Sequence, residues 1–151
     1  MVEINKKSVL RLLLAPLVIG LLLTSVCLHL ETGTASPETQ TQIIKNINPK
    51  EAYTLILKNK DNPGFVILDV RTSGEFANGR IENAVNLDYY SETFKNDLNK
   101  LDKDKTYLIY CRTGSRSGKA LDIMKELKFG KVYNMLGGIT RWKTEGLPTT
   151  K

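Results

Sequence analysis

The stretch that decides the fold reads TYLIYCRTGSRS and spans residues 106–117. Its first five residues, 106–110, form a continuous apolar run, which is typical of a strand buried on both faces of a parallel sheet. Residues 111–116 predict a turn, and residues 117–127 carry apolar side chains on one helical face. A strand, a short turn and a helix in this order indicate an α/β unit whose ligand site lies beyond the carboxyl end of the strand.

The rest of the chain alternates between strand and helix patterns. Asn48 can cap a helix, Pro49 suits its first position, and Glu51 completes the pattern of a helix start. Strands are expected at residues 43–47, 65–70, 84–87 and 131–135, and helices at residues 49–59, 73–78, 92–100 and 139–145. This alternation predicts an α/β domain with a mostly parallel sheet.

The composition limits the classes of protein to which the chain can belong. Its 151 residues, 41% hydrophobic and 25% charged, suit one globular domain. The net charge of +6 favours anionic ligands or surfaces, or serves solubility alone. Because no run of basic residues is interleaved with aromatic ones, nucleic-acid binding is not expected.

The N-terminal segment has the layout of a secretory signal. Lys6, Lys7 and Arg11 precede an apolar run at residues 12–28, and small and polar residues follow it. Basic residues before the run predict that the remainder is translocated. We therefore expect an exported protein, periplasmic or otherwise extracytoplasmic, in which residues 12–28 are either cleaved off with a signal peptide or retained as a membrane anchor. Contact with a membrane is expected through this segment only.

Three regions follow from these patterns. Residues 1–30 are expected to form the signal peptide or N-terminal membrane anchor, residues 31–42 a linker rich in Thr, Ser, Glu and Gln, and residues 43–148 the folded domain. Cys27 lies at the end of the apolar run, and its context differs from that of Cys111, so the two cysteines are not expected to pair. Removal of the segment would leave Cys111 as a single thiol.

Cys111 stands where a reactive thiol is expected. Backbone N–H groups of a turn between a strand and a helix can point at one spot, and Gly114 permits the backbone conformation that this requires. A thiol held there should have a lowered pKa and react as the thiolate. Arg112 and Arg116 add positive charge that would attract an anion, and a bound anion would offset the unfavourable position of Arg116 at a helix start. The alternative is an inert buried cysteine, which does not need two cations beside it.

The domain contains no histidine, because the single histidine of the chain is His29. A metal-ligand cluster is therefore not expected, and neither is a Cys–His pair of the protease type. We expect no metal and no other cofactor. The turn itself must activate the Cys111 thiol.

Three separated segments resemble a rhodanese domain. They are residues 68–87, with LDVR, EF and GRIENAVNL; residues 111–117, CRTGSRS; and residues 136–148, with LGGI, Trp142 and GLP. The match covers residues 43–148. It implies a rhodanese-like three-layer α/β domain with a central, mostly parallel five-stranded sheet flanked by helices. The resemblance also implies that a cysteine persulfide is formed from a small anionic sulfur donor such as thiosulfate and passed to a thiol, to cyanide or to a protein acceptor.

The resemblance assigns roles to individual residues. Cys111 would carry the sulfur, and Asp69, Arg71 and Ser117 would support the site, although Asp69 and Arg71 could equally form a structural ion pair. The residues expected to bind the substrate or cradle the sulfur are Arg112, Thr113, Gly114, Ser115 and Arg116. Gly137 and Gly138 would allow close backbone approach, and Trp142 would belong to the core. The chain departs from the family at Arg80 and Glu82, where His and Pro are frequent.

Three functions remain open from the sequence. The first is a sulfurtransferase or sulfur carrier. The second is a phosphatase or an arsenate-reductase-type enzyme that uses the same cysteine loop, which the short loop disfavours because a tetrahedral oxyanion needs more room than sulfur. The third is a non-enzymatic module that senses persulfide or binds a protein.

Overall fold

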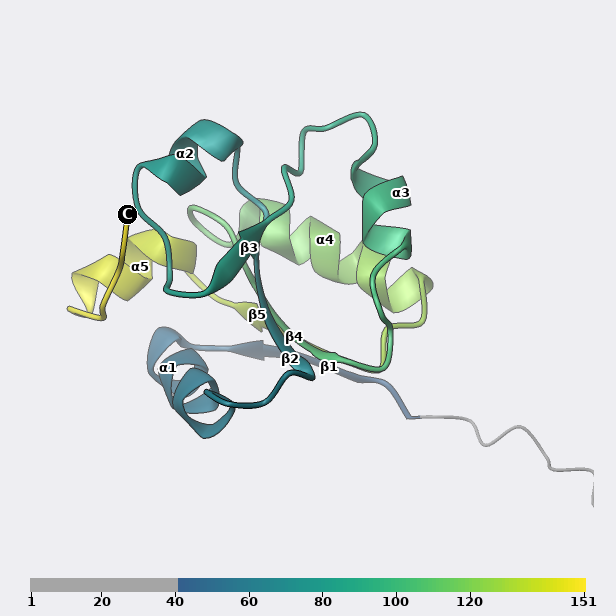
Figure 1. Ribbon diagram of the computed structural model, residues 1–151, viewed down its shortest axis with the longest axis horizontal. Coiled ribbons are helices and arrows are strands. Elements are labelled where there is room, and N and C mark those ends of the chain that lie inside the picture. Colours follow the sequence, from purple (N-terminus) through teal and green to yellow (C-terminus); the bar gives the residue numbers. More distant parts are fainter. Residues whose placement is uncertain (1–40) are drawn as a thin grey trace, which may run out of the picture. The chain divides into compact units, whose positions relative to one another are not determined.

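Five strands form one sheet in the computed structural model, which describes residues 41–151 (Figure 1). Their bounds are β1 Ile43–Ile47, β2 Phe65–Asp69, β3 Ala84–Asn86, β4 Thr106–Tyr110 and β5 Lys131–Met135. The order across the sheet is β1-β5-β4-β2-β3, and every pair of these neighbours is parallel. The fold class predicted from the sequence is confirmed, and the sheet is fully rather than mostly parallel.

Helices cover both faces of the sheet and make three layers. One face carries α1 (Pro49–Lys58) and α5 (Gly138–Thr144), whose side chains Ala52, Ile139 and Trp142 are buried in one apolar cluster. The other face carries α3 (Phe94–Asn99) and α4 (Ser115–Glu126), which belong to a second cluster. The short helix α2 (Ser73–Ala77) lies beyond the carboxyl end of β2 (Figure 1). The sheet therefore has the two covered faces that parallel strands require.

The central strand β4 confirms the prediction of burial on both faces. Tyr107 and Ile109 lie in the cluster under α3 and α4, and Leu108 and Tyr110 lie in the cluster under α1 and α5. All four are at most 2% exposed. The continuous apolar run is needed because neither face of this strand meets water.

Two helices begin with reciprocal caps. In α1 the Asn48 side chain accepts from the Glu51 N–H at 2.9 Å, and the Glu51 carboxylate accepts from the Asn48 N–H at 2.8 Å, which confirms the predicted helix start. In α2 the Thr72 and Glu75 side chains make the same arrangement. Such a cap contributes about 1 kcal/mol, and in α2 it also fixes the position of the Glu75 carboxylate.

The structure corrects several element boundaries. α4 begins at Ser115 rather than at residue 117, because Gly114 takes a left-handed conformation (φ 99°) and starts the helix without a side-chain cap. α3 is shorter than the predicted 92–100, and β3 ends one residue before the predicted 87. The new start of α4 places Ser115 and Arg116 in the first turn of the helix instead of in the preceding loop.

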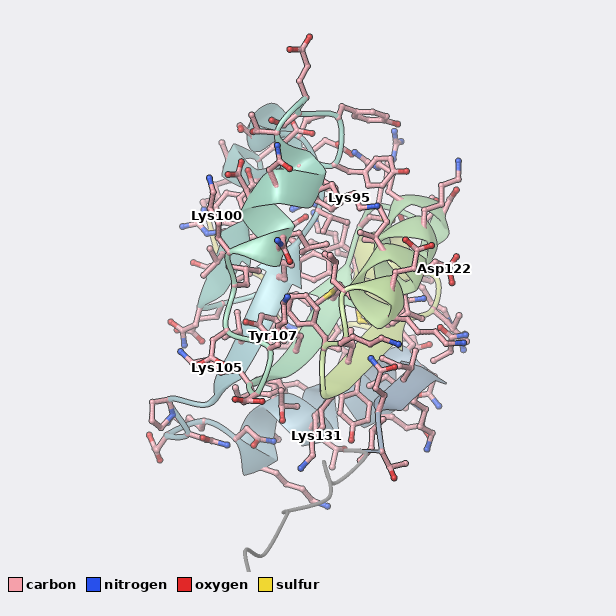
Figure 2. The ribbon with its side chains drawn as sticks, turned by 90° about the vertical axis from the view of Figure 1, so that its right-hand side faces the viewer. Lys95, Lys100, Lys105, Tyr107, Asp122 and Lys131 are labelled. Atoms are coloured by element: carbon pink, nitrogen blue, oxygen red, sulfur yellow. The ribbon has the colours of Figure 1, made fainter. Side chains whose placement is uncertain are left out.

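Figure 2 labels lysines on and directly after α3 and at the starts of β4 and β5. Lys131 begins β5, Lys105 directly precedes β4, and both lie at the opposite end of their strands from Cys111. Lys100 forms an ion pair with Asp97 at 2.7 Å. The net positive charge is thus spread over the surface.

The predicted signal or anchor at residues 1–30 lies outside the described residues, as does the predicted linker up to residue 40. Within residues 41–151, no helix combines the length and apolar character needed to cross a membrane.

Candidate active site

Cys111 lies at the carboxyl edge of the sheet, directly after β4. Its side chain is a free thiol, and the residue is 1% exposed. Because β4 lies between β5 and β2, the turn that follows it is flanked by the segments after those two strands. In Figure 1 this turn lies between α2 and α5 and leads into α4. The sequence predicted this position for the site.

The thiol of Cys111 receives hydrogen bonds from the turn and from the start of α4. The Gly114 N–H donates to Sγ at 3.1 Å, and the Ser117 hydroxyl donates to Sγ at 3.6 Å. The backbone N–H groups of Ser117 and Thr113 also contribute to lowering the pKa of the Cys111 thiol. Burial by itself would raise the pKa of the Cys111 thiol, but these donors stabilise the thiolate and hold the pKa below its ordinary value.

The N–H groups of the Cys111 turn can point toward the sulfur because the carbonyl groups of the turn point away from it and bind to α5. The Ile139 N–H donates to the Cys111 carbonyl at 2.9 Å, and the Thr140 N–H donates to the Arg112 carbonyl at 3.0 Å. At Gly138 (φ +57°) a Cβ atom would collide with the Cys111 carbonyl oxygen and come within 2.6 Å of the Arg112 carbonyl. The close backbone approach expected at this glycine is therefore present, and it orients the peptides around the sulfur.

Arg116 is paired with a carboxylate of the protein itself, and its role in binding a substrate anion stays a prediction. Its guanidinium donates to both carboxylate oxygens of Glu75, at 2.7 and 2.8 Å. This pair, with help from the Thr72 N–H, lowers the pKa of Glu75 to about 2 and raises the pKa of Arg116. The Tyr90 ring lies 5.4 Å from the Arg116 guanidinium carbon. Glu75 thus supplies the anion that offsets the position of Arg116 at the start of α4.

Asp69 and Arg71 form a buried ion pair at the end of β2. The Arg71 Nη2 and the Asp69 Oδ2 atoms are 2.6 Å apart, and the two side chains are 5% and 0% exposed. The same Arg71 nitrogen donates to the Gly79 carbonyl at 2.8 Å. Burial opposes the charge of Arg71, but the Asp69 carboxylate keeps the pKa of Arg71 above its ordinary value. The pair ties the end of β2 to the segment after α2, and its supporting role at the site stays a prediction.

A cleft of about 240 Å³ adjoins the turn between α2 and α5. The residues that line it are Arg71, Glu75, Asn78, Arg112, Ile139, Thr140 and Lys143. The exposed Arg112 side chain is the part of the turn that borders this cleft. Thr113 and Ser115 have exposed side chains, so they can contribute to a cradle through their backbone.

Sequence reasoning did not predict that Glu75 and Tyr90 contact Arg116 or that Lys143 lines the cleft. The capping pattern from Thr72 to Glu75 could have located the Glu75 carboxylate at a helix start, but not its partner in α4. No sequence pattern marked Tyr90 or Lys143. Among residues 41–151, no group of three His, Cys, Asp or Glu side chains could hold a metal ion.

Comparison with known proteins agrees with this geometry. The family model described as "Rhodanese-like domain" matches residues 48–145. The chain belongs to this family. A sulfurtransferase of Allochromatium vinosum is 31% identical over 102 residues, which cover 68% of this chain and 94% of the relative. The rhodanese-like family suggested by the three sequence segments is therefore confirmed.

Two further matches show the range of proteins that contain this rhodanese-like domain. The crystal structure of a rhodanese-like domain protein from Staphylococcus aureus is 31% identical, with a TM-score of 0.58 and coverage of 71% of this chain and 99% of that one. A tRNA uridine(34) hydroxylase of an Enterobacter species is 36% identical over 98 residues, which cover 58% of this chain but only 28% of the hydroxylase. The domain thus occurs alone and as a small part of larger enzymes.

Proposed function

We propose that this rhodanese-like domain is a sulfurtransferase or sulfur carrier that holds a sulfane sulfur on Cys111. The observation that carries the proposal is the ring of hydrogen-bond donors around Sγ, with the Gly114 N–H at 3.1 Å and the Ser117 hydroxyl at 3.6 Å. Donors fixed in this way favour the thiolate before the reaction and an anionic persulfide after it.

The first step transfers sulfur from a small anionic donor such as thiosulfate. The Cys111 thiolate attacks the outer sulfur of thiosulfate, a new S–S bond forms, and the bond between the two sulfur atoms of thiosulfate breaks. The bonding electrons leave with the sulfite dianion, and the terminal sulfur of Cys111–S–S⁻ takes the negative charge. No proton and no external oxidant is required, which suits a site without a histidine among residues 41–151.

The second step returns the enzyme to its starting state. A thiolate or a cyanide ion attacks the terminal sulfur of the persulfide, and the S–S bond to Cys111 breaks with its electrons remaining on the Cys111 sulfur. The products are an organic persulfide or thiocyanate and the free Cys111 thiolate. Because one product leaves before the acceptor binds, the kinetics should be of the ping-pong type.

The surrounding residues support these steps in different ways. We assign the cradle to the backbone of Arg112, Thr113, Gly114, Ser115 and Arg116, and the attraction of the donor to the exposed Arg112 side chain. Ser117 supports the thiolate directly through its N–H and hydroxyl groups. The buried pair of Asp69 and Arg71 supports the site through the position of β2.

Direct hydrogen bonds to the sulfur favour sulfur transfer over attack on phosphorus or arsenic. A tetrahedral oxyanion above Cys111 needs the N–H groups of the turn for its own oxygens. Here the Gly114 N–H of the turn donates to Sγ itself, and Cys111 is 1% exposed. An assay with an aryl phosphate separates the two reactions, and turnover that depends on Cys111 would favour the phosphatase class.

The test of the proposal is the intact mass of the full chain before and after thiosulfate, with the Cys111→Ser variant measured in parallel. We expect the mass of one sulfur atom to be gained, to be absent from the variant, and to be lost on addition of cyanide. No gain with thiosulfate or with an organic persulfide donor would contradict the proposal. Full biological activity of the Cys111→Ser chain would instead favour a non-enzymatic binding module.

We also propose that residues 1–30 direct the chain out of the cytoplasm, as a cleaved signal peptide or as an anchor through residues 12–28. The basic residues Lys6, Lys7 and Arg11 before the apolar run support the proposal. The test is fractionation of cells that express the full chain with a C-terminal tag. Protection of the tag from protease added to intact spheroplasts would contradict export.

A further inference from the structure

The cleft between α2 and α5 carries positive charge beyond the attraction of the donor that we assign to Arg112. Four charged residues line it, namely Arg71, Glu75, Arg112 and Lys143. Arg71 is neutralised by Asp69 at 2.6 Å, and Glu75 is neutralised by Arg116 at 2.7 Å. The two remaining cations make no ion pair within residues 41–151, so the cleft keeps a charge of about +2.

The position of the cleft connects it to the reactive sulfur. Arg112 directly follows Cys111, and its carbonyl is held by the Thr140 N–H at 3.0 Å. Thr140 lines the cleft together with Lys143, which lies three residues further along α5. A ligand in the cleft would therefore lie beside the Cys111 turn, with Arg112 and Lys143 contributed by two different elements.

The lining also selects the kind of anion. Asn78 and Thr140 offer an amide and a hydroxyl next to the two cations, and Ile139 provides apolar surface. The cleft of about 240 Å³ lies below the roughly 300–1,000 Å³ of pockets for drug-sized ligands. Free donors, two cations and a small volume suit a compact organic anion with one or two carboxylates.

We propose that this cleft binds the carboxylate of the organic sulfur compound that exchanges sulfur with Cys111. The inference rests on the proposed sulfur transfer and names the substrate class of that site. A carboxylate-bearing thiolate, R–S⁻, attacks the terminal sulfur of Cys111–S–S⁻, the S–S bond to Cys111 breaks, and R–S–S⁻ and the Cys111 thiolate are released. In the reverse reaction, an organic persulfide with the same carboxylate would donate its sulfur to Cys111, so the test includes both directions of transfer.

The acceptor arm compares two probe thiols with the full chain and thiosulfate as donor. Mercaptosuccinate carries two carboxylates and 2-mercaptoethanol carries none, and each rate is expressed per concentration of thiolate. We expect kcat/KM to favour mercaptosuccinate, and the ratio of the two values to fall about two- to fivefold in Lys143→Gln, a loss of the size expected for one partly exposed charge pair. The ratio should recover in Lys143→Arg, which keeps the charge.

Lys131→Gln is the matched control, because Lys131 is an exposed lysine at the opposite end of the sheet from Cys111 (Figure 2). It should leave the ratio unchanged. The donor arm measures formation of the Cys111 persulfide from the persulfide of mercaptosuccinate and from thiosulfate. A preference for the carboxylate-bearing compound that depends on Lys143, in either arm, supports binding in the cleft. If the acceptor arm shows this preference, the cleft binds the acceptor, and if the donor arm shows it, the cleft binds the donor.

Binding of succinate separates the failure of this inference from the failure of the proposed function. Succinate carries no sulfur, so its binding to the full chain, followed by NMR at the Thr140 and Lys143 amides, does not depend on persulfide chemistry. We expect saturable binding that Lys143→Gln weakens and that added salt weakens further. A Lys143→Gln variant with an unchanged acceptor ratio and unchanged succinate binding would overturn the proposal. If the parent chain shows no turnover with cyanide or with either thiol, the proposed sulfur transfer itself is contradicted.

Discussion

At the scale of single residues, Ser117 is the side chain that most directly controls the sulfur. Its hydroxyl and its N–H both contact Sγ and oppose the effect of burial on the pKa of Cys111. In Ser117→Ala the hydroxyl is lost, so the pKa of Cys111 should rise and less thiolate should exist at neutral pH. We expect alkylation by iodoacetamide at pH 7 to slow about three- to tenfold and its pH profile to move to higher pH. Ser73→Ala, a change at an exposed serine of α2, is the control.

The ion pair of Asp69 and Arg71 gives a second prediction at this scale. Asp69→Asn removes the carboxylate and leaves a buried cation, so the free energy of unfolding should fall by about 3–5 kcal/mol. The double variant Asp69→Leu, Arg71→Met removes both charges and should lose less than the single variant. Urea unfolding measures both values. A double variant that is less stable than the single variant would show that the pair itself, rather than an unpaired charge, decides the outcome.

At the scale of elements, the contact between α5 and the Cys111 turn depends on one glycine. A Cβ at Gly138 would lie 2.6 Å from the Arg112 carbonyl carbon and oxygen, and the residue has a positive φ of +57°. Gly138→Ala should therefore reduce the free energy of unfolding by about 2–4 kcal/mol and slow persulfide formation, because the carbonyls of the turn are displaced. Both effects are measured on the same preparation, by urea unfolding and by intact mass over time.

Gly118 provides the matched control for Gly138. It lies inside α4, and a Cβ there would meet no atom within 4 Å. Gly118→Ala should stabilise the protein by about 0.5–1 kcal/mol, because alanine is the better residue within a helix. Equal losses of stability in the two variants would contradict the explanation by close approach.

The elements also show which features a sequence can predict. β4 was predicted with the bounds that the structure has, because a strand buried on both faces has a continuous apolar run. The start of α1 was predicted because its capping side chains are three residues apart. The predicted start of α4 was wrong by two residues. Gly114 begins the helix through its backbone conformation and has no side chain that could mark the cap in the sequence.

At the scale of the whole molecule, the site joins segments that are distant in the sequence. Glu75 and Arg116 are 41 positions apart, and the cleft combines residues from the segment after β2, from α2, from the Cys111 turn and from α5. The sequence predicted Cys111 and the cradle because they form one continuous segment. It could not predict the partner of Arg116 or the place of Lys143 in the cleft, because both depend on how distant segments pack together.

The ion pair between Glu75 of α2 and Arg116 of α4 makes the free energy of unfolding of the domain depend on pH. Arg116 holds the pKa of Glu75 at about 2, well below its ordinary value of 4.5. A carboxyl with a lowered pKa in the folded state contributes stability above the pKa of the unfolded chain, and this stability is lost as the pH falls from about 4.5 towards 2. Since the Glu75 side chain is 28% exposed, solvent screens the pair, and we expect a contribution of about 1–2 kcal/mol.

Glu75→Gln isolates this contribution, because glutamine at the same position of the cap can still accept the hydrogen bond at the start of α2. The free energy of unfolding of the variant should be lower than that of the parent chain at pH 6, and the difference should shrink as the pH falls from 4.5 to 2.5. Glu82→Gln, at an exposed residue, should follow the parent chain throughout. A difference for Glu75→Gln that is constant over this range would show that the packing of α2, and not the charge of Glu75, supports the site from that side.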